Sequence, residues 1–280
     1  MTPVSDPTLK HERALGRQGA RLVIGVDEVG RGALAGPVAV GMCVIDPVRP
    51  GRFPVGLRDS KLLAEPRREQ LAPLAAAWAR ASAVGLASAN EVDELGIMVC
   101  LGLAGARAFA LLLEAGVDVS GAVLVLDGNY DYLSRHLPVA GVPASAAAPA
   151  VPPLPVSASA APPAPSAVSP LPVSASAAPS AVPPPYAAAG GSEGPSYRVT
   201  TRIKADRDCA SVAAASVVAK VHRDRLMIDL DAQVPGYGWA SNKGYSSSAH
   251  FEALDLLGPS AHHRLTWLKS ERMLVELEQG

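Results

Sequence analysis

The 280-residue sequence has few cysteines and no excess of either charge. Its three cysteines, Cys43, Cys100 and Cys209, lie far apart, and there is no CxxC pair. This spacing indicates neither a zinc site nor a disulfide framework, so we expect reduced, mostly buried thiols. The 25 Lys and Arg residues nearly balance the 26 Asp and Glu residues. That balance argues against a protein that coats polyanions, although a local basic groove is compatible with it.

The sequence also lacks long uninterrupted apolar runs. No stretch of 18 or more apolar residues is free of proline or charge, so we expect no membrane span. Residues 1–20, which we interpret as an N-terminal extension, are polar and charged, and this excludes a signal peptide. We therefore expect a cytoplasmic protein that acts as a monomer.

One segment, residues 138–196, has little besides proline, alanine, serine and valine, and Glu193 is its only charged residue. The ten residues PLPVSASAAP occur at 153–162 and again at 170–179. Repeated prolines prevent helices and central strands, while alanine and serine bury too little apolar area to offset the ordering entropy. We predict a disordered insertion that acts as a spacer; docking of a partner is the alternative.

The remaining residues alternate between strand and helix patterns. We predict strands at residues 21–28, 36–46, 82–89, 121–129 and 197–206, and helices at residues 60–81, 97–116, 210–232 and from 250 onward. Asn90 is the expected N-cap of a short helix. This alternation indicates an α/β fold. We assign residues 21–137 and 197–234 to one α/β domain and residues 235–280 to a C-terminal helical segment.

Four acids fall at three predicted strand ends: Asp27 and Glu28, Asp127, and Asp206. Strand ends often meet at the ligand-binding edge of an α/β sheet, and acids packed closely there need cations. Oxygen ligands without a histidine or cysteine cluster favour Mg²⁺ or Mn²⁺. Neighbours in a strand point to opposite faces, so Asp27 and Glu28 cannot both point inward unless the strand twists or ends there, or Glu28 also contributes its carbonyl. Each acid alone would be an ordinary cap or turn residue.

Five motifs, in this order, resemble ribonuclease HII, the prokaryotic type 2 ribonuclease H family. They are GVDEVGRGALAGPV at 25–38, DSKLL at 59–63, DGN at 127–129, KADRDCASVAAASVVAKVHRDRLM at 204–227 and NKGYSSSAHFEAL at 242–254. Together with the segments between them, they cover nearly all of the chain outside the insertion. The insertion itself and the tail HHRLTWLKSERML, which only partly keeps the family's closing pattern, are departures.

The resemblance implies that residues 21–137 and 197–234 form an RNase H-like catalytic domain, with a mixed sheet flanked by helices. It implies that residues 235–280 form a C-terminal helical segment that binds substrate. It implies hydrolysis of RNA in RNA–DNA hybrids and incision 5′ of ribonucleotides in duplex DNA, giving 3′-hydroxyl and 5′-phosphate ends. Two-metal catalysis with Mn²⁺ or Mg²⁺ is part of the same expectation. The residues at the family's metal-binding catalytic positions are Asp27, Glu28, Asp127 and Asp206. Those at its ribose-recognition positions are Gly30, Arg31, Gly32 and Tyr245.

Basic residues near these motifs suit a nucleic-acid substrate. Residues 198–225 hold seven basic and three acidic residues, a net charge of +4, which indicates either a phosphate-tracking surface or a solvated helix face. We predict that Lys61 and Lys220 contact phosphates. Two other functions remain open: a catalytically idle binding protein that uses its proline-rich insertion to dock a partner, and a different metal-dependent nuclease that cuts DNA junctions. Retention of all four acids argues against the first.

Overall fold

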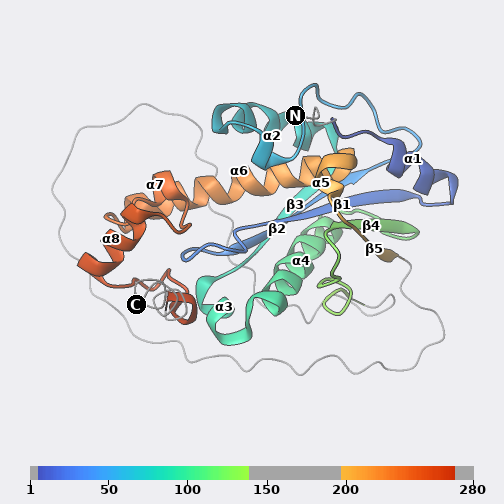
Figure 1. Ribbon diagram of the computed structural model, residues 1–280. Coiled ribbons are helices and arrows are strands. Elements are labelled where there is room, and N and C mark those ends of the chain that lie inside the picture. The colour runs from blue at the N-terminus through green and yellow to red at the C-terminus, as the bar shows by residue number, and fades with distance from the viewer. Residues whose placement is uncertain (1–5, 139–196, 269–280) are drawn as a thin grey trace.

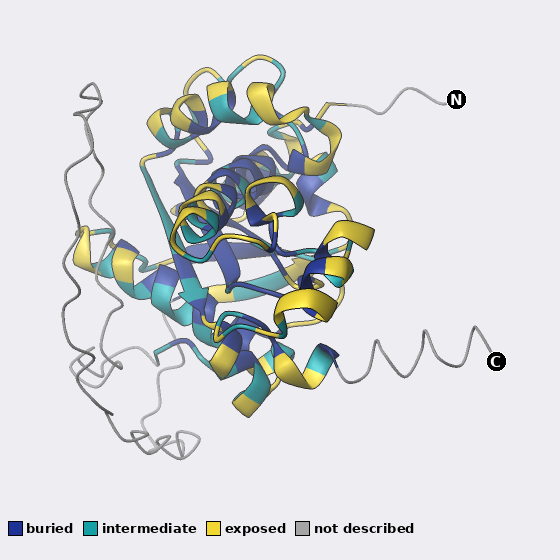
Figure 2. Ribbon diagram, turned by 90° about the vertical axis from the view of Figure 1, so that its left-hand side faces the viewer, coloured by how far each residue is buried: buried dark blue, intermediate teal, exposed yellow. Residues whose placement is uncertain are grey.

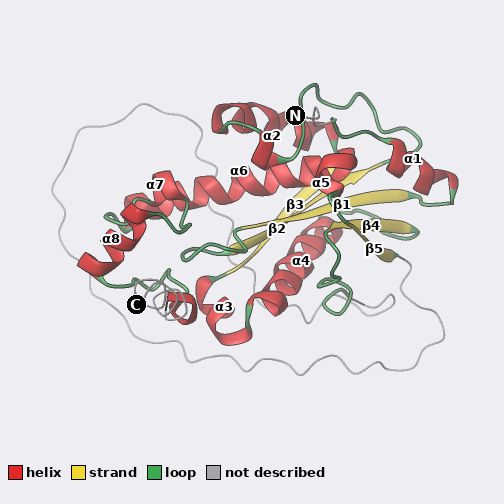
Figure 3. Ribbon diagram, viewed as in Figure 1, coloured by secondary structure: helices red, strands yellow, loops and turns green. Residues whose placement is uncertain are grey.

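The centre of the molecule is a five-stranded mixed sheet. The computed structural model describes residues 6–138 and 197–268, so the predicted insertion lies almost wholly outside the described residues. The strand order is β3-β2-β1-β4-β5 (Figure 3). The strands are β1 (Leu22–Val29), β2 (Val38–Ile45), β3 (Ala81–Ala87), β4 (Ala122–Asp127) and β5 (Arg198–Arg202). β1 pairs antiparallel with β2 and parallel with β4, which confirms the predicted mixed sheet.

Two long helices cover the opposite faces of this sheet (Figure 1). α4 (Ile97–Glu114) packs on one face and α6 (Ala210–Gln233) on the other, with α2 (Glu65–Trp78) outside α6. The shorter helices are α1 (Lys10–Arg17), η1 (Ser60–Leu62), α3 (Ala89–Leu95), α5 (Ala205–Asp208), α7 (Trp239–Asn242) and α8 (Ser248–Leu257). Buried residues line the sheet and the inner sides of the helices, and exposed ones lie outside (Figure 2). The last two helices confirm the predicted C-terminal helical segment.

α6 lies unusually close to the sheet because small residues face each other there. A side chain at Gly25 in β1 would overlap the backbone of Ser211, and one at Gly41 in β2 would press on Ala215. The alanines of α6 at 213, 214 and 215 are fully buried. The close approach sets the N-terminal end of α6 against the end of β1, which is where the acids gather.

α4 is long and apolar enough, by length and composition alone, to cross a membrane. In this structure its buried side packs on β2 and β3, within the largest hydrophobic cluster. Arg107 in its middle bonds the carboxylate of Glu91 at 2.7 Å and the carbonyl of Leu86 at 2.7 Å. The helix therefore serves here as the core helix of the sheet.

The N-terminal segment packs against the α/β domain. Glu12 in α1 is fully buried, and its Oε1 accepts hydrogen bonds from the backbone N–H and the hydroxyl of Ser211, at 2.8 and 2.9 Å. Thr8 forms a bridge with Cys209, just before α6. These contacts tie α1 to the base of the helix that carries much of the site.

Three local predictions are wrong. The N-cap of α3 is Ser88, not Asn90, because Ser88 and Glu91 form a reciprocal capping box. The helix predicted from residue 60 begins as the 3₁₀ turn η1 and becomes α-helical only at Glu65. β5 ends at Arg202, and Lys204 is left-handed with φ of 60°, so Asp206 lies in the short helix α5 rather than at a strand end.

Candidate active site

Asp27 and Asp127 lie on neighbouring parallel strands and share one face. Val26 in β1 is in register with Leu126 in β4, so the two aspartates follow side by side. Alternate residues of a strand share a face. Val23 and Val125 pack with Val212 of α6, and Asp27 and Asp127 therefore point toward α6 as well. The carboxylates of Asp27 and Asp127 therefore lie between the sheet and α6.

Glu28 follows the other face of β1, as strand geometry requires. Its neighbours two and four positions back, Val26 and Ile24, belong to the core under α4. Its Oε1 lies 3.8 Å from Nη1 of Arg31, and its backbone N–H donates to Oδ1 of Asp27 at 2.9 Å. Burial, followed by the charge of Asp127, raises the pKa of Glu28, so the strand end leaves this carboxylate within reach of the other acids.

Asp206 joins the group through α5. Oδ1 of Asp127 accepts hydrogen bonds from the backbone N–H groups of Ala205, at 2.7 Å, and Asp206, at 3.4 Å. Asp127 thereby fixes the start of this short helix. Burial, followed by the charges of Asp127 and Asp59, raises the pKa of Asp206 to about 6. The four acids predicted from the sequence therefore interact with one another.

The acids outnumber the cations around them. Burial, followed by the charge of Glu28, raises the pKa of Asp27 well above its usual range. Burial opposes the charged form of Lys61, but the charges of the surrounding acids, led by Asp27 and Asp59, raise its pKa. Within the two described stretches, no three Asp, Glu, His or Cys side chains are already arranged to hold a metal ion. The carboxylates are close enough to repel, yet they do not form a closed coordination sphere.

This donor set fits a hard divalent cation. The groups are carboxylate oxygens, which Mg²⁺ and Mn²⁺ prefer, and the raised pKa values of Asp27, Glu28 and Asp206 reflect burial and mutual repulsion that a cation would relieve. His250 and His263, by contrast, are buried together, with their Nε2 atoms 3.1 Å apart, and Nδ1 of His250 lies 2.9 Å from the carbonyl of Tyr245. These contacts give both histidines a structural role.

Sequence reasoning missed two residues of this site. Asp59 is fully buried; its Oδ1 accepts the N–H of Lys61 at 2.9 Å, and its Oδ2 lies 3.5 Å from Arg207. Ser216 hydrogen-bonds to Asp27, and its hydroxyl lies 2.9 Å from that of Ser60. The DSKLL motif contained the first signal, but an acid before a short helical turn is also an ordinary cap. Ser216 had no separate signal among the small residues of α6.

The glycine loop, residues 30–37, follows directly from the acids of β1. Gly30 has φ of 80°, and a side chain there would overlap the guanidinium of Arg223. Gly32 is different, because a Cβ at this position would meet nothing within 4 Å. In the described part of the chain, the N–H groups of Arg31 and Gly32, both exposed, have no hydrogen-bond partner. Gly32 thus keeps a backbone donor open to an outside molecule.

Tyr245 completes this side of the site. Its hydroxyl accepts a hydrogen bond from the N–H of Gly30 at 3.1 Å. Its ring has Nζ of Lys220 at 5.4 Å and the guanidinium of Arg223 at 5.3 Å from the centroid. The structure therefore brings the tyrosine to the glycine loop, although 215 positions separate Gly30 from Tyr245 in the chain.

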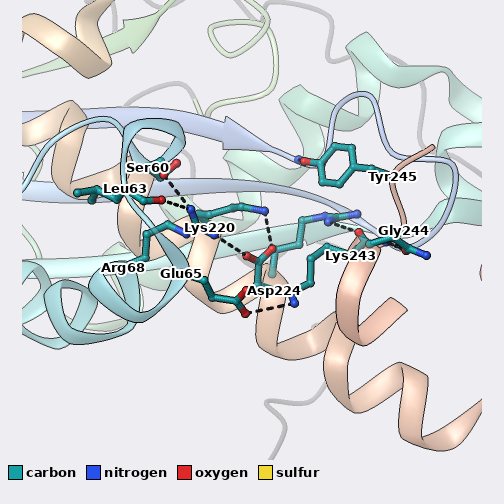
Figure 4. Close-up of polar contacts among 12 residues, drawn as sticks. Ser60, Leu63, Glu65, Arg68, Lys220, Asp224, Lys243, Gly244 and Tyr245 are labelled. Carbon is teal, nitrogen blue, oxygen red and sulfur yellow. Dashed lines mark hydrogen bonds and ion pairs between the residues drawn. The ribbon is translucent and has the colours of Figure 1, made fainter. Parts of the chain in front are cut away.

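The basic stretch does not form one phosphate-facing surface. Lys220 lies near Tyr245, but its Nζ is bound by Asp224 at 2.6 Å (Figure 4). Arg223 is fully buried and therefore not available to a phosphate. The other ion pairs of this stretch join Arg202 to Asp208, Arg207 to Asp59, and Arg225 to Glu69. Of the two predicted lysines, exposed Lys61 lies among the acids, whereas Lys220 has an internal partner.

Comparison with known proteins decides the family. The family model for ribonuclease HII matches residues 24–129 and 173–270. The ribonuclease HII of Streptomyces griseus is 39% identical over 269 residues, which is 95% of this chain and 85% of the relative. The chain belongs to the ribonuclease HII family. As a family member it is a ribonuclease H-type endonuclease. The residues predicted from the sequence for this site all fall inside the matched residues: Asp27, Glu28, Gly30, Arg31, Gly32, Lys61, Asp127, Asp206, Lys220 and Tyr245.

Solved structures agree on the fold. The ribonuclease H2 of Pyrococcus horikoshii superposes with a TM-score of 0.52 at 20% identity, covering 92% of this chain and all of that one. Bst-RNase HIII in complex with Mn²⁺ superposes with a TM-score of 0.57 at 17% identity, covering 95% of this chain and 73% of that one. The mixed sheet with its flanking helices is therefore the fold of these ribonucleases H.

Proposed function

We propose that this member of the ribonuclease HII family is a metal-dependent endoribonuclease that hydrolyses RNA in RNA–DNA hybrids and incises duplex DNA 5′ of embedded ribonucleotides. The observation that carries the proposal is the pair of free N–H groups at Arg31 and Gly32. They lie in the loop that begins two residues after the acids of β1, beside the hydroxyl of Tyr245. Recognition of a sugar and chemistry at its phosphate would then occur at adjacent positions.

Asp27, Glu28, Asp127 and Asp206 would hold Mg²⁺ or Mn²⁺, the cations their oxygen donors suit. When bound, the ions supply Lewis acidity that favours an attacking water and a leaving oxygen. Water adds to phosphorus, the bond from phosphorus to the 3′ oxygen breaks, and that oxygen takes up a proton. The products are a 3′-hydroxyl and a 5′-phosphate, a polarity inferred from the family.

The remaining residues bind and orient the strand. Exposed Arg31 and Lys61 provide positive charge near the acids, where a phosphate would lie. The Tyr245 hydroxyl already accepts from Gly30, so its own proton is free to donate to a ribose 2′-hydroxyl. A deoxyribose leaves such donors without a partner, and an unpaired buried polar group costs about 1–3 kcal/mol. Only RNA offers the 2′-hydroxyl, which makes this contact selective.

Matched duplexes with zero, one and four consecutive ribonucleotides test the proposal. The purified protein is incubated with each duplex in Mg²⁺, in Mn²⁺ and in a chelator, and the ends are mapped. We expect cleavage only where ribonucleotides are present, on their 5′ side, and only with metal. Equal cutting of the all-DNA duplex, or full activity in chelator, would refute it.

A further inference from the structure

A buried arginine from the C-terminal segment binds the inner side of the glycine loop. Arg264 is fully buried. Its Nη2 donates to the carbonyls of Gly30, at 2.7 Å, and Gly36, at 3.1 Å, and its Nη1 donates to the carbonyl of Arg31 at 2.9 Å. One guanidinium therefore spans the loop from its first residue to its seventh.

A second buried arginine joins the loop to the turn that carries Tyr245. Arg223 of α6 donates through Nε to the carbonyl of Pro37, at 2.8 Å, and through Nη2 to that of Ala35, at 3.0 Å. Its Nη1 donates to the carbonyl of Lys243 at 2.9 Å, and its guanidinium lies 5.3 Å from the Tyr245 ring centroid. Arg223 thus fixes both parts of the recognition site relative to each other.

These bonds decide which way the loop backbone faces. Backbone pairing adds to them: Leu34 and Ala35 donate to the carbonyl of Gly244, and the N–H of Arg264 donates to the carbonyl of Leu34. The carbonyls bound by the two arginines in these ways are those of Gly30, Arg31, Leu34, Ala35, Gly36 and Pro37. With these carbonyls held inside, the free N–H groups of Arg31 and Gly32 remain exposed.

Stability alone does not account for two buried guanidinium groups. Neither forms an ion pair with a carboxylate in residues 6–138 or 197–268. Burial lowers the pKa of both, and that of Arg264 falls to about 10, with the charge of Arg223 as the second cause. Apolar side chains of similar volume would avoid the desolvation penalty. What an arginine adds is a planar fork of donors that can hold several carbonyls in fixed directions.

We infer that Arg223 and Arg264 are positioning residues that hold the glycine loop and Tyr245 in the arrangement that distinguishes a ribonucleotide from a deoxyribonucleotide. This inference rests on the proposed function. Neither guanidinium needs to touch the substrate, because each acts through the backbone that does. The C-terminal segment, which supplies Arg264 and Tyr245, thereby determines selectivity.

Arg264→Lys tests the inference, because lysine keeps the charge but loses the fork. Arg107→Lys is the matched control: Arg107 also bonds a backbone carbonyl and is partly buried, but it lies between α4 and β3. Single-turnover cleavage is measured on duplexes with zero and one ribonucleotide. Affinities for both duplexes are measured with proteins that also carry Asp127→Asn, so that the duplex is not cleaved during the binding measurement.

For Arg264→Lys we expect cleavage of the one-ribonucleotide duplex to fall by about 100-fold, the scale of a misplacement of roughly 1 Å. Its affinity preference for that duplex over all-DNA should shrink, with affinity for all-DNA unchanged. Arg107→Lys should lower the melting temperature and leave both properties at wild-type values. A folded Arg264→Lys protein with wild-type rate and preference, or one that loses only melting temperature, would overturn the inference.

Hydrogen exchange separates the inference from the proposed function, because it needs no activity. In the wild type, the N–H groups of Arg31 and Gly32 should exchange quickly, and those of Leu34, Ala35 and Gly36 slowly. In Arg264→Lys the N–H groups of Leu34, Ala35 and Gly36 should exchange quickly as well. If this variant does not fold, Arg223→Lys is measured in its place. Equally fast exchange throughout the wild-type loop would refute the positioning role. A wild type that ignores ribonucleotides but has this exchange pattern would refute only the proposed function.

Discussion

The two halves of the candidate active site are built in opposite ways. Around Asp27, Asp127 and Asp206, buried carboxylates face one another with Lys61 among them, and burial and repulsion raise the pKa values of Asp27 and Asp206. In the glycine loop, by contrast, nearly every inward-facing carbonyl already has an internal donor. The acids would need a bound cation to balance their charge, whereas the carbonyls of the loop are already hydrogen-bonded within the protein.

This difference predicts different responses to mutation. Removing a carboxylate takes away function and relieves repulsion, so activity falls while the metal-free fold does not weaken. Removing an internal donor from the loop side disturbs geometry, so discrimination falls before affinity for DNA does.

The largest effect is expected for Asp127→Asn. Asparagine keeps an oxygen that can accept the N–H of Ala205, so α5 should stay in place. It loses the charge expected to hold metal, and cleavage should fall by about 1,000-fold or more, at or above the upper end for loss of one electrostatic group. Single-turnover assays in Mg²⁺ and Mn²⁺ measure it.

Asp118→Asn is the control for that variant. Asp118 is also a carboxylate that accepts a backbone N–H, but it is exposed and paired with Arg21 away from the site. It should cleave at the wild-type rate. Near-normal cutting by Asp127→Asn itself would show that the acids of β1 and β4 do not hold the catalytic metal.

Tyr245→Phe tests the recognition half with a smaller expected effect. It removes the hydroxyl that accepts from Gly30 but keeps the ring beside Lys220 and Arg223. Losing the hydrogen bonds of this hydroxyl should remove about 1–2 kcal/mol of transition-state stabilisation, which corresponds to a 5- to 30-fold lower cleavage rate. Turnover should fall more than binding, and most for a single embedded ribonucleotide; Tyr245→Ala should be worse. Equal losses on one and on four ribonucleotides would contradict this role for the hydroxyl.

The sequence predicted the sheet, its long helices and the acids because these depend on short-range patterns. A continuous apolar run marks β1, and an acid after the apolar run of β4 marks Asp127. The strand periodicity even indicated that Asp27 and Glu28 would face opposite sides, which the structure confirms. In this chain, a single sequence is enough to predict a local helix or strand and the residue at its end.

Long-range contacts could not be predicted in this way. Arg223 looked like one more charge in a basic helix, yet it is buried against the carbonyl of Ala35, 188 positions away. Arg264 and Asp59 were missed for the same reason, because no local sequence pattern predicts that an isolated charged residue is buried. Asp206 was located correctly but placed on the wrong element, because the left-handed Lys204 ends the strand pattern without a glycine.

A smaller effect is expected in the metal-free stability of Asp206→Asn. The pKa of Asp206 is raised to about 6, so the folded protein holds a proton that the unfolded chain releases near pH 4. Stability is therefore lost as pH rises through this window. In chelator at pH 8, Asp206→Asn should melt higher than wild type by a few degrees, on the order of 2–4 °C. The difference should vanish near pH 4, and divalent cation should reverse it at pH 8.

Asp208→Asn is the control two residues away. Asp208 pairs with Arg202 at 2.6 Å and is half exposed, so its loss should lower the melting temperature slightly or not at all. Comparing each variant with wild type at the same pH cancels the contributions of the histidines whose pKa values burial lowers, which shift stability in the opposite direction; these are His11, His136, His222, His250 and His263. An Asp206→Asn protein that melts lower at pH 8 would show that the acids are not repelling one another.

The smallest effect is expected from the predicted insertion, which lies almost wholly outside the described residues. Its two ends already meet, because the hydroxyl of Tyr197 donates to the carbonyl of Pro138. Residues 128–138 therefore complete the crossover that a parallel pair such as β4 and β5 requires.

The free-energy cost of closing a loop changes by only about 0.6 kcal/mol per doubling of its length. Replacing residues 140–194 with a short Gly/Ser linker should leave the melting temperature and both cleavage activities nearly unchanged, and limited proteolysis of the wild type should cut first within this stretch. A large loss of cleavage with an unchanged melting temperature would place the insertion in the substrate site, as a third region beside the acids and the glycine loop.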